Sequence, residues 1–150
     1  MFYELATMTL PFGTAGTAAQ NVKAFCTAPD AKGELLACWF TDIGSLNQMI
    51  VLRGFASLAE LQAERERTQL SASPFGCGEV FQKLEQHSYR GFPWMKPVRP
   101  SAESGINGPV YEIRTYGIKP GGVQPTIDLW AQYVPPREKL SPCVIAMVAL

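Results

Sequence analysis

The polar residues of this chain that are best suited to chemistry are spaced two positions apart. They are Glu112, Arg114 and Tyr116. They lie in a stretch rich in β-forming residues, where alternate side chains point to the same face of a strand. The carboxylate and the guanidinium are then roughly 7 Å apart at the backbone, close enough for their side chains to meet. Two interpretations stay open: an ion pair that satisfies itself, or a polar floor on which Arg114 donates paired hydrogen bonds to an acidic or carbonyl-bearing ligand.

Glu4 follows a tyrosine in the same way near the start of the chain, but no arginine stands two residues later. In an apolar cavity its carboxyl pKa would rise, and the group could act as a general acid or base. In water or beside a cation it would remain an ordinary carboxylate. The sequence leaves these environments open.

A second polar cluster surrounds an expected β-hairpin and consists of Trp39, Asp42, Asn47 and Arg53. An aromatic wall beside an amide and a carboxylate could hold and polarise a substrate, as in a cofactor-independent oxygenase. The alternative is structural, because Asp and Asn are favoured beside glycine-containing turns and a strand needs a bulky core residue. Both interpretations are kept.

Charge and composition exclude several classes of function. Thirteen basic and thirteen acidic residues leave no net charge, which argues against a nucleic-acid partner. No apolar run approaches the ~20 residues that cross a bilayer, so we expect no membrane span. The balanced charge protects weakly against self-association, and a homo-oligomer is expected.

No motif for a metal or a cofactor is visible, and we predict neither. His87 is the only histidine, and no P-loop, GxGxxG or HExxH pattern occurs. The cysteines are scattered without CxxC spacing, which favours reduced thiols in a cytoplasmic protein. They are Cys26, Cys38, Cys77 and Cys143.

The chain repeats itself at an offset of 108 residues. Tyr3-Glu4-Leu5 reappears as Tyr111-Glu112-Ile113, and the apolar stretch 35–40 falls on 143–148 without a gap. Such a repeat decides the architecture. It predicts one complete module and the opening half of a second.

Periodicity and turn signals predict the elements of these modules. The first reads strand, helix, strand, strand, helix, strand, at residues 2–10, 18–28, 34–41, 46–54, 58–70 and 83–90. This order predicts an α+β, ferredoxin-like module over residues 1–90. A Pro- and Gly-rich linker is expected at 91–108. The incomplete second module, 109–150, would contain a strand at 110–118, a helix that stops at Pro135-Pro136 and a strand at 143–150, a βαβ half-module.

The string Tyr111-Glu112-Ile113-Arg114-Thr115-Tyr116, followed by Lys119-Pro120-Gly121, resembles the first-strand signature of the NIPSNAP family. The hairpin sequence 42–53 and Phe92-Pro93-Trp94 are also similar to that family. The first module is a weaker version, in which Ala6 stands in place of Arg114 and Met8 in place of Tyr116. The resemblance implies the dimeric α+β barrel fold, in which two ferredoxin-like modules pack sheet against sheet around a cavity.

Most members of the family lack an assigned reaction. We therefore expect a self-associating protein that binds a small apolar or acidic ligand, or a protein partner, with an inter-sheet cavity as the ligand site. The alternative is a small enzyme of the same barrel type, such as a cofactor-independent oxygenase. In either case the candidate site residues are Glu4, Trp39, Asp42, Asn47, Arg53, Glu112, Arg114 and Tyr116, and the catalytic residues are unknown.

Overall fold

The computed structural model describes residues 1–100 and 108–150 and divides the chain into two compact units. Unit 1 contains Met1–Arg90 together with Ala149–Leu150, and unit 2 contains Gly91–Val148. Each unit has its own apolar core and is described by itself.

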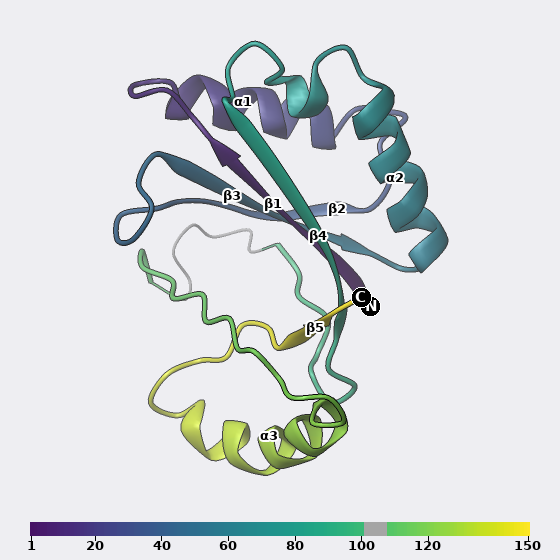
Figure 1. The fold of residues 1–150 in the computed structure, drawn as a ribbon, viewed down its shortest axis with the longest axis vertical. Helices are drawn as coiled ribbons and strands as arrows, with labels where there is room; N and C mark the ends of the chain where they lie inside the picture. Colours follow the sequence, from purple (N-terminus) through teal and green to yellow (C-terminus); the bar gives the residue numbers. More distant parts are fainter. Residues whose placement is uncertain (101–107) are drawn as a thin grey trace. The chain divides into compact units, whose positions relative to one another are not determined.

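Unit 1 follows the order strand, helix, strand, strand, helix, strand, as predicted (Figure 1). The strands are β1 (Phe2–Thr9), β2 (Glu34–Phe40), β3 (Gln48–Phe55) and β4 (Lys83–Gly91). The helices are α1 (Ala15–Cys26) and α2 (Leu58–Leu70), with a short 3-10 turn, η1 (Pro74–Gly76), after α2. The predicted boundaries are close to these, so the ferredoxin-like order is confirmed.

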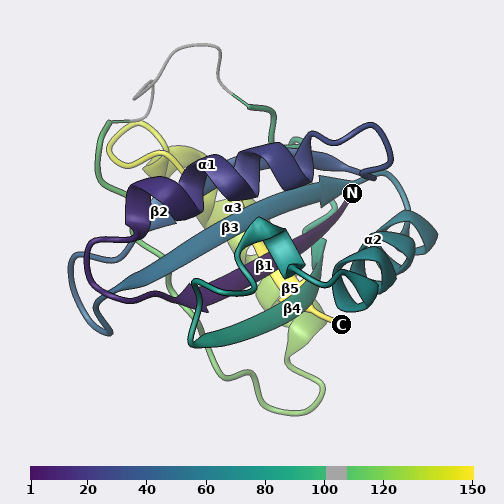
Figure 2. The ribbon, with the colours of Figure 1, turned by 90° about the horizontal axis from the view of Figure 1, so that it is seen from above.

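The sheet runs in the order β2-β3-β1-β4-β5, where β5 is the short strand Met147–Ala149 at the end of the chain. β1 pairs antiparallel with both β3 and β4, so it is a central strand. α1 and α2 lie on the same face of this sheet (Figure 2). The other face carries no helix of unit 1.

The apolar core of unit 1 lies between the sheet and these helices. Ala6 and Met8 of β1 alternate toward the helices and are fully buried, together with Val51 of β3. α1 contributes Ala18 and Val22, four residues apart and therefore on one helical face. The same alternation directs Glu4 and Arg53 to this helix-covered face.

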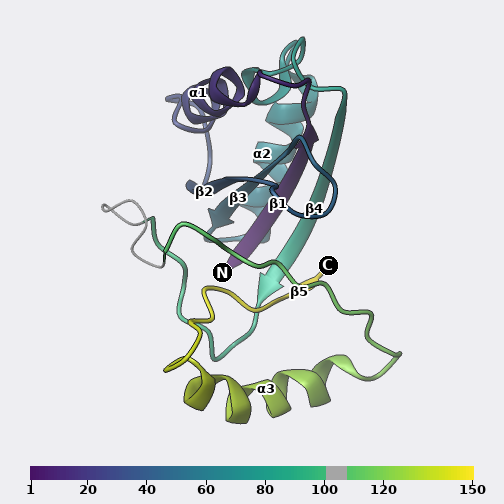
Figure 3. The same ribbon diagram turned by 90° about the vertical axis from the view of Figure 1, so that its left-hand side faces the viewer.

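Unit 2 packs around α3 (Val123–Arg137), which can be followed in Figure 3. Ile127 of this helix is buried with Phe92, and the indole N–H of Trp94 donates to the carbonyl of Ile127 at 3.0 Å. Phe92 and Trp94, which the sequence suggested for a linker, thus belong to a core. Residues 101–107 of the expected linker lie outside the described residues.

Three predictions about residues 109–150 need correction. Residues 110–118 form no strand in the described structure, because a strand exists only where a neighbour completes its ladder and none is present there. The last strand is limited to Met147–Ala149 rather than 143–150. α3 continues through Pro135 and Pro136 to Arg137, because these prolines fall in its last turn and the N–H of Glu138 still bonds to Val134 at 3.0 Å.

Candidate functional site: a buried charge cluster and the opposite sheet face

Three ionisable side chains from three elements meet under the helices of unit 1. Glu4 of β1, Arg53 of β3 and Glu64 of α2 are each at most 1% exposed. The Nε of Arg53 donates to Glu4 Oε2 at 2.9 Å, and its Nη2 donates to the same oxygen. Its Nη1 donates to Glu64 Oε1 at 2.7 Å. One guanidinium therefore bridges the sheet and α2.

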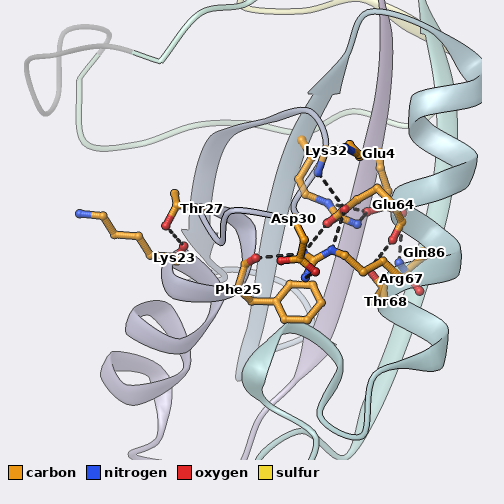
Figure 4. Close-up of polar contacts among 11 residues, drawn as sticks. Glu4, Lys23, Phe25, Thr27, Asp30, Lys32, Glu64, Arg67, Thr68 and Gln86 are labelled. Carbon is orange, nitrogen blue, oxygen red and sulfur yellow. Dashed lines mark hydrogen bonds and ion pairs between the residues drawn. The ribbon is translucent and has the colours of Figure 1, made fainter.

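Each carboxylate in this cluster accepts further hydrogen bonds, several of which are drawn in Figure 4. Gln86 of β4 donates to the free oxygen of Glu4 at 3.0 Å. Glu64 accepts from the backbone N–H of Lys32 at 3.0 Å and from both Nε and Nη2 of Arg67. The cluster consequently links β1, β3, β4, α2 and the loop before β2.

Aromatic rings complete the surroundings of the two arginines. The guanidinium carbon of Arg53 lies 4.6 Å from the ring centroid of Phe75, and that of Arg67 lies 3.9 Å from Phe25. These distances allow cation–π attraction, which is stronger away from water. The contacts also bring η1 and the end of α1 into the same cluster.

The environment keeps the Glu64 carboxylate ionised. Burial alone raises the pKa of Glu64, but the hydrogen bonds from Arg67 and Lys32 and the charge of Arg53 outweigh it, so the pKa lies below its ordinary value. The hydrogen bond to Glu64 likewise raises the pKa of Arg67. Burial raises the pKa of the nearby Cys26 thiol to about 11, which makes it a poor nucleophile at neutral pH.

The charged groups of this cluster form hydrogen bonds and ion pairs with one another, so the cluster offers no unpaired polar group to a ligand. Among the described residues, no buried side-chain nitrogen or oxygen lacks a hydrogen-bond partner. The ion-paired alternative for Glu4 is therefore confirmed, and Arg53 is its partner. The expectation that this polar face points into an inter-sheet space is wrong for Glu4, because the helices cover its side of the sheet.

The opposite face of the unit 1 sheet has an apolar patch on β1, β2 and β3, whereas β4 places Lys83, Glu85 and His87 on the same face. Directly paired residues share a face, so Leu5 lies beside Leu52, and Ile50 beside Trp39. Leu52 is buried, while Leu5, Ile50 and Trp39 are half-buried. Trp39 and Arg53, predicted to form one site, are therefore on opposite faces.

The two candidate site residues of the hairpin turn are exposed to solvent. Asp42 and Asn47 are both exposed, and Asn47 adopts the left-handed conformation with φ 58° that asparagine tolerates in turns. Asn47 borders a shallow surface pocket of about 190 Å³, whose apolar wall includes Leu10 and Phe40. Asp42 does not line this pocket, and the hairpin residues do not converge on one cavity.

In unit 2, Arg114 donates to Glu112 at 2.7 Å, so the predicted ion pair between these residues is confirmed. The hydrogen bond from Arg114 lowers the pKa of Glu112 and keeps the carboxylate charged. Tyr116 stacks edge-on against Trp130 of α3, with centroids 5.6 Å apart. Tyr116, the third residue of the predicted polar series, therefore contacts α3.

The comparisons with known proteins agree with this fold. A family model described as NIPSNAP matches residues 3–85. A protein NipSnap homolog of Dictyostelium discoideum is 33% identical over 107 residues, which is 71% of this chain. The chain belongs to the NIPSNAP family. It spans 46% of the length of that relative.

Two crystal structures share the fold of this NIPSNAP chain. An uncharacterized NIPSNAP domain protein from Burkholderia xenovorans is 19% identical, with a TM-score of 0.50, and the match covers 65% of this chain and 100% of that one. A NIPSNAP family protein from Agrobacterium tumefaciens is 21% identical, with a TM-score of 0.50, and covers 65% and 98%. These likenesses support the predicted α+β class.

Sequence reasoning missed two members of the charge cluster in this NIPSNAP chain. Glu64 and Arg67 are not among the predicted site residues, yet Glu64 is fully buried and Arg67 binds it. A signal was available, because Arg53 interrupts an apolar strand and a buried arginine needs a carboxylate. Only the tertiary structure identifies which carboxylates meet it.

All four cysteines are free thiols, as predicted. No helix within residues 1–100 and 108–150 is long and apolar enough to cross a membrane.

Proposed function

We propose that this NIPSNAP chain self-associates through the sheet face of unit 1 that α1 and α2 do not cover, and encloses a small apolar ligand there. The observation that carries the proposal is that both helices cover one face of the sheet, while Leu5, Ile50 and Trp39 lie on the other. A sheet with an apolar face gains free energy by packing that face against another layer.

The chemistry of the two faces favours an apolar ligand over an acidic one. Arg53 is turned away from this face and already bridges two carboxylates. Arg114 is likewise engaged with Glu112. Leu5, Ile50 and Trp39 offer apolar surface to a ligand, and His87 and Tyr89 of β4, on the same face, would fix its orientation.

The test is native mass spectrometry of the complete 150-residue chain, with Ile50→Glu as the variant. We expect a dimer with a reproducible extra mass, and we expect Ile50→Glu to lower the dimer fraction at least ~10-fold, because a carboxylate cannot be buried without a partner. Leu70→Glu, at an 80% exposed position of α2, is the matched control and should leave the dimer intact.

Thermal unfolding of both variants checks that unit 1 remains folded. A chain that stays monomeric at all concentrations would contradict the proposal. So would a dimer that survives the Ile50→Glu change without loss of the extra mass.

The alternative, a small oxygenase, stays a prediction. Its expected residues are separated within unit 1: Trp39 lies on the sheet face opposite α1 and α2, and Asn47 lies in the exposed turn. The finer architecture is also proposed here, namely a dimeric α+β barrel and a tandem repeat with modules at 1–90 and 109–150. The free cysteines favour a reducing compartment, and we propose the cytoplasm.

A further inference from the structure

Two loops of unit 1 carry the two most exposed large apolar side chains of that unit. Phe12, in the loop between β1 and α1, is 93% exposed, and Ile43, in the turn between β2 and β3, is 92% exposed. Leu46 of the same turn is 59% exposed, and Phe40 at the end of β2 is 47% exposed. Exposed apolar surface marks protein or membrane contacts, because it gains free energy when it leaves water.

The two loops lie side by side at one end of the unit 1 sheet. The N–H of Leu10 donates to the carbonyl of Asn47 at 2.8 Å, which joins one loop to the other. Both loops are at the same end of unit 1 in two perpendicular views (Figure 1 and Figure 2). The shallow pocket beside Asn47 is lined by Pro11 of one loop and Phe40 at the start of the other. Residues 10–14 and 40–47 together form the loop end of unit 1.

Hydrogen bonds within each loop hold its backbone in place. The N–H and the hydroxyl of Thr14 both donate to the carbonyl of Pro11, at 3.3 and 2.8 Å. Between them Gly13 has a φ of 84°, which is typical of the third position of a type II turn. At the base of the hairpin, the N–H of Thr41 donates to the carbonyl of Gln48 at 3.0 Å. Preformed loops lose little conformational freedom when they bind.

The charge of the loop end indicates what kind of surface it fits. Residues 10–14 contain no charged side chain, and residues 40–47 contain only Asp42. An anionic membrane or an acidic partner is attracted by basic side chains at the contact. The loop end offers none, so it matches a surface without net charge.

The exposed apolar area of the loop end is small for a protein partner. It is contributed by Phe12, Phe40, Ile43 and Leu46. Together these side chains offer roughly 500 Å², whereas a standard protein–protein interface buries about 800 Å² on each partner. A bilayer sets no such threshold, because its fluid surface closes around a single side chain and each inserted apolar group adds its own transfer free energy.

We infer that the loop end of unit 1 inserts into the surface of a phospholipid bilayer whose headgroups carry no net charge. Phe12 and Ile43 enter the boundary between headgroups and acyl chains, and Asp42 stays among the headgroups. The contact attaches the protein to a membrane without spanning it. It uses none of the residues of the proposed sheet-face dimer and does not rest on that proposal.

The test is flotation of the complete 150-residue chain with unilamellar vesicles of phosphatidylcholine. We expect the chain to float with the vesicles, and Phe12→Ser/Ile43→Ser to lower the partition coefficient at least ~10-fold, because the transfer free energy of two side chains is lost. Leu58→Ser/Leu70→Ser is the matched control, since it removes leucines that are 50% and 80% exposed on α2, and it should leave binding unchanged. Thermal unfolding checks that both variants are folded.

A fluorescent variant measures whether the loop end reaches the acyl chains. Phe12→Trp keeps the tip apolar, and the unsubstituted chain with its three tryptophans sets the background. We expect vesicles of phosphatidylcholine brominated on the acyl chains to quench the added fluorescence. Phosphatidylserine in the vesicles should not strengthen binding and added salt should not weaken it, because the loop end has no basic side chain.

Four results would overturn the inference. The first is no flotation with phosphatidylcholine, and the second is binding that requires phosphatidylserine and disappears in salt. The third is a Phe12→Ser/Ile43→Ser variant that binds as tightly as the parent. The fourth is a change of oligomeric state caused by the same two substitutions without vesicles, because a second copy of the chain then covers the loop end.

Discussion

Arg53 shows how a single residue organises the polar part of this core. Its guanidinium donates to Glu4 and Glu64 and lies over Phe75, so it contacts β1, α2 and η1 at once. A buried ion pair of this kind contributes little compared with an apolar replacement of the whole set, but removal of one partner is costly because it leaves an uncompensated charge. We therefore expect the cluster to fix the position of α2 on the sheet more than to add net stability.

We expect Arg53→Met to lower the free energy of unfolding by about 3–5 kcal/mol, because Glu4 then keeps only Gln86 as a partner. Urea denaturation followed by circular dichroism measures the change. Arg90→Met, at an exposed position of the same sheet, is the control and should change stability by less than about 0.5 kcal/mol. A loss below about 1 kcal/mol for Arg53→Met would show that the carboxylates find other partners.

At the scale of the element, α2 is the helix whose start the sequence predicts best. The Ser57 hydroxyl accepts from the N–H of Glu60 at 3.1 Å, and the Glu60 carboxylate accepts from the N–H of Ala56 at 2.9 Å. This is the capping box that the pattern Ser-Leu-Ala-Glu indicates, with the return bond one residue earlier than usual. By contrast, residues 110–118 have equally clear strand propensity, and they form no strand because a ladder needs a neighbour.

Ser57→Ala should reduce the free energy of unfolding by about 1 kcal/mol, since the N–H of Glu60 loses its acceptor. Ser45→Ala, in the exposed hairpin turn, serves as the comparison and should fall within about 0.5 kcal/mol of the parent. Chemical denaturation of both variants provides the measurement. Equal stability of the two would mean that water replaces the cap at no cost.

At the scale of the whole molecule, the offset of 108 residues predicts equal conformational demands before the two helices. Gly13 and Gly121 both have positive φ, and neither has an atom within 4 Å of the position where a Cβ would lie. An alanine at either site therefore meets conformational strain without a steric clash. This makes the two glycines a clean comparison between the units.

Gly13→Ala and Gly121→Ala should each cost about 1–2 kcal/mol, the penalty for an L-residue in the left-handed region. Gly16→Ala, inside α1, should have the opposite sign and stabilise by about 0.5–1 kcal/mol. Tryptophan fluorescence in a denaturant titration follows both units, because Trp39 lies in unit 1 while Trp94 and Trp130 lie in unit 2. If neither Gly13→Ala nor Gly121→Ala changed the free energy of unfolding, the glycines would no longer support a repeat.

Local patterns in the sequence determined the element order of unit 1, the cap of α2 and the ion pair between Glu112 and Arg114. Each of these depends on residues within a few positions of one another, where periodicity and hydrogen-bonding chemistry are decisive. Only the tertiary structure decided that Glu4 and Arg53 face the helices, that Glu64 is buried with them and that Trp39 lies on the other side. Those outcomes depend on strand register and helix packing between residues up to about 60 positions apart, and a one-residue shift of register would exchange the two faces.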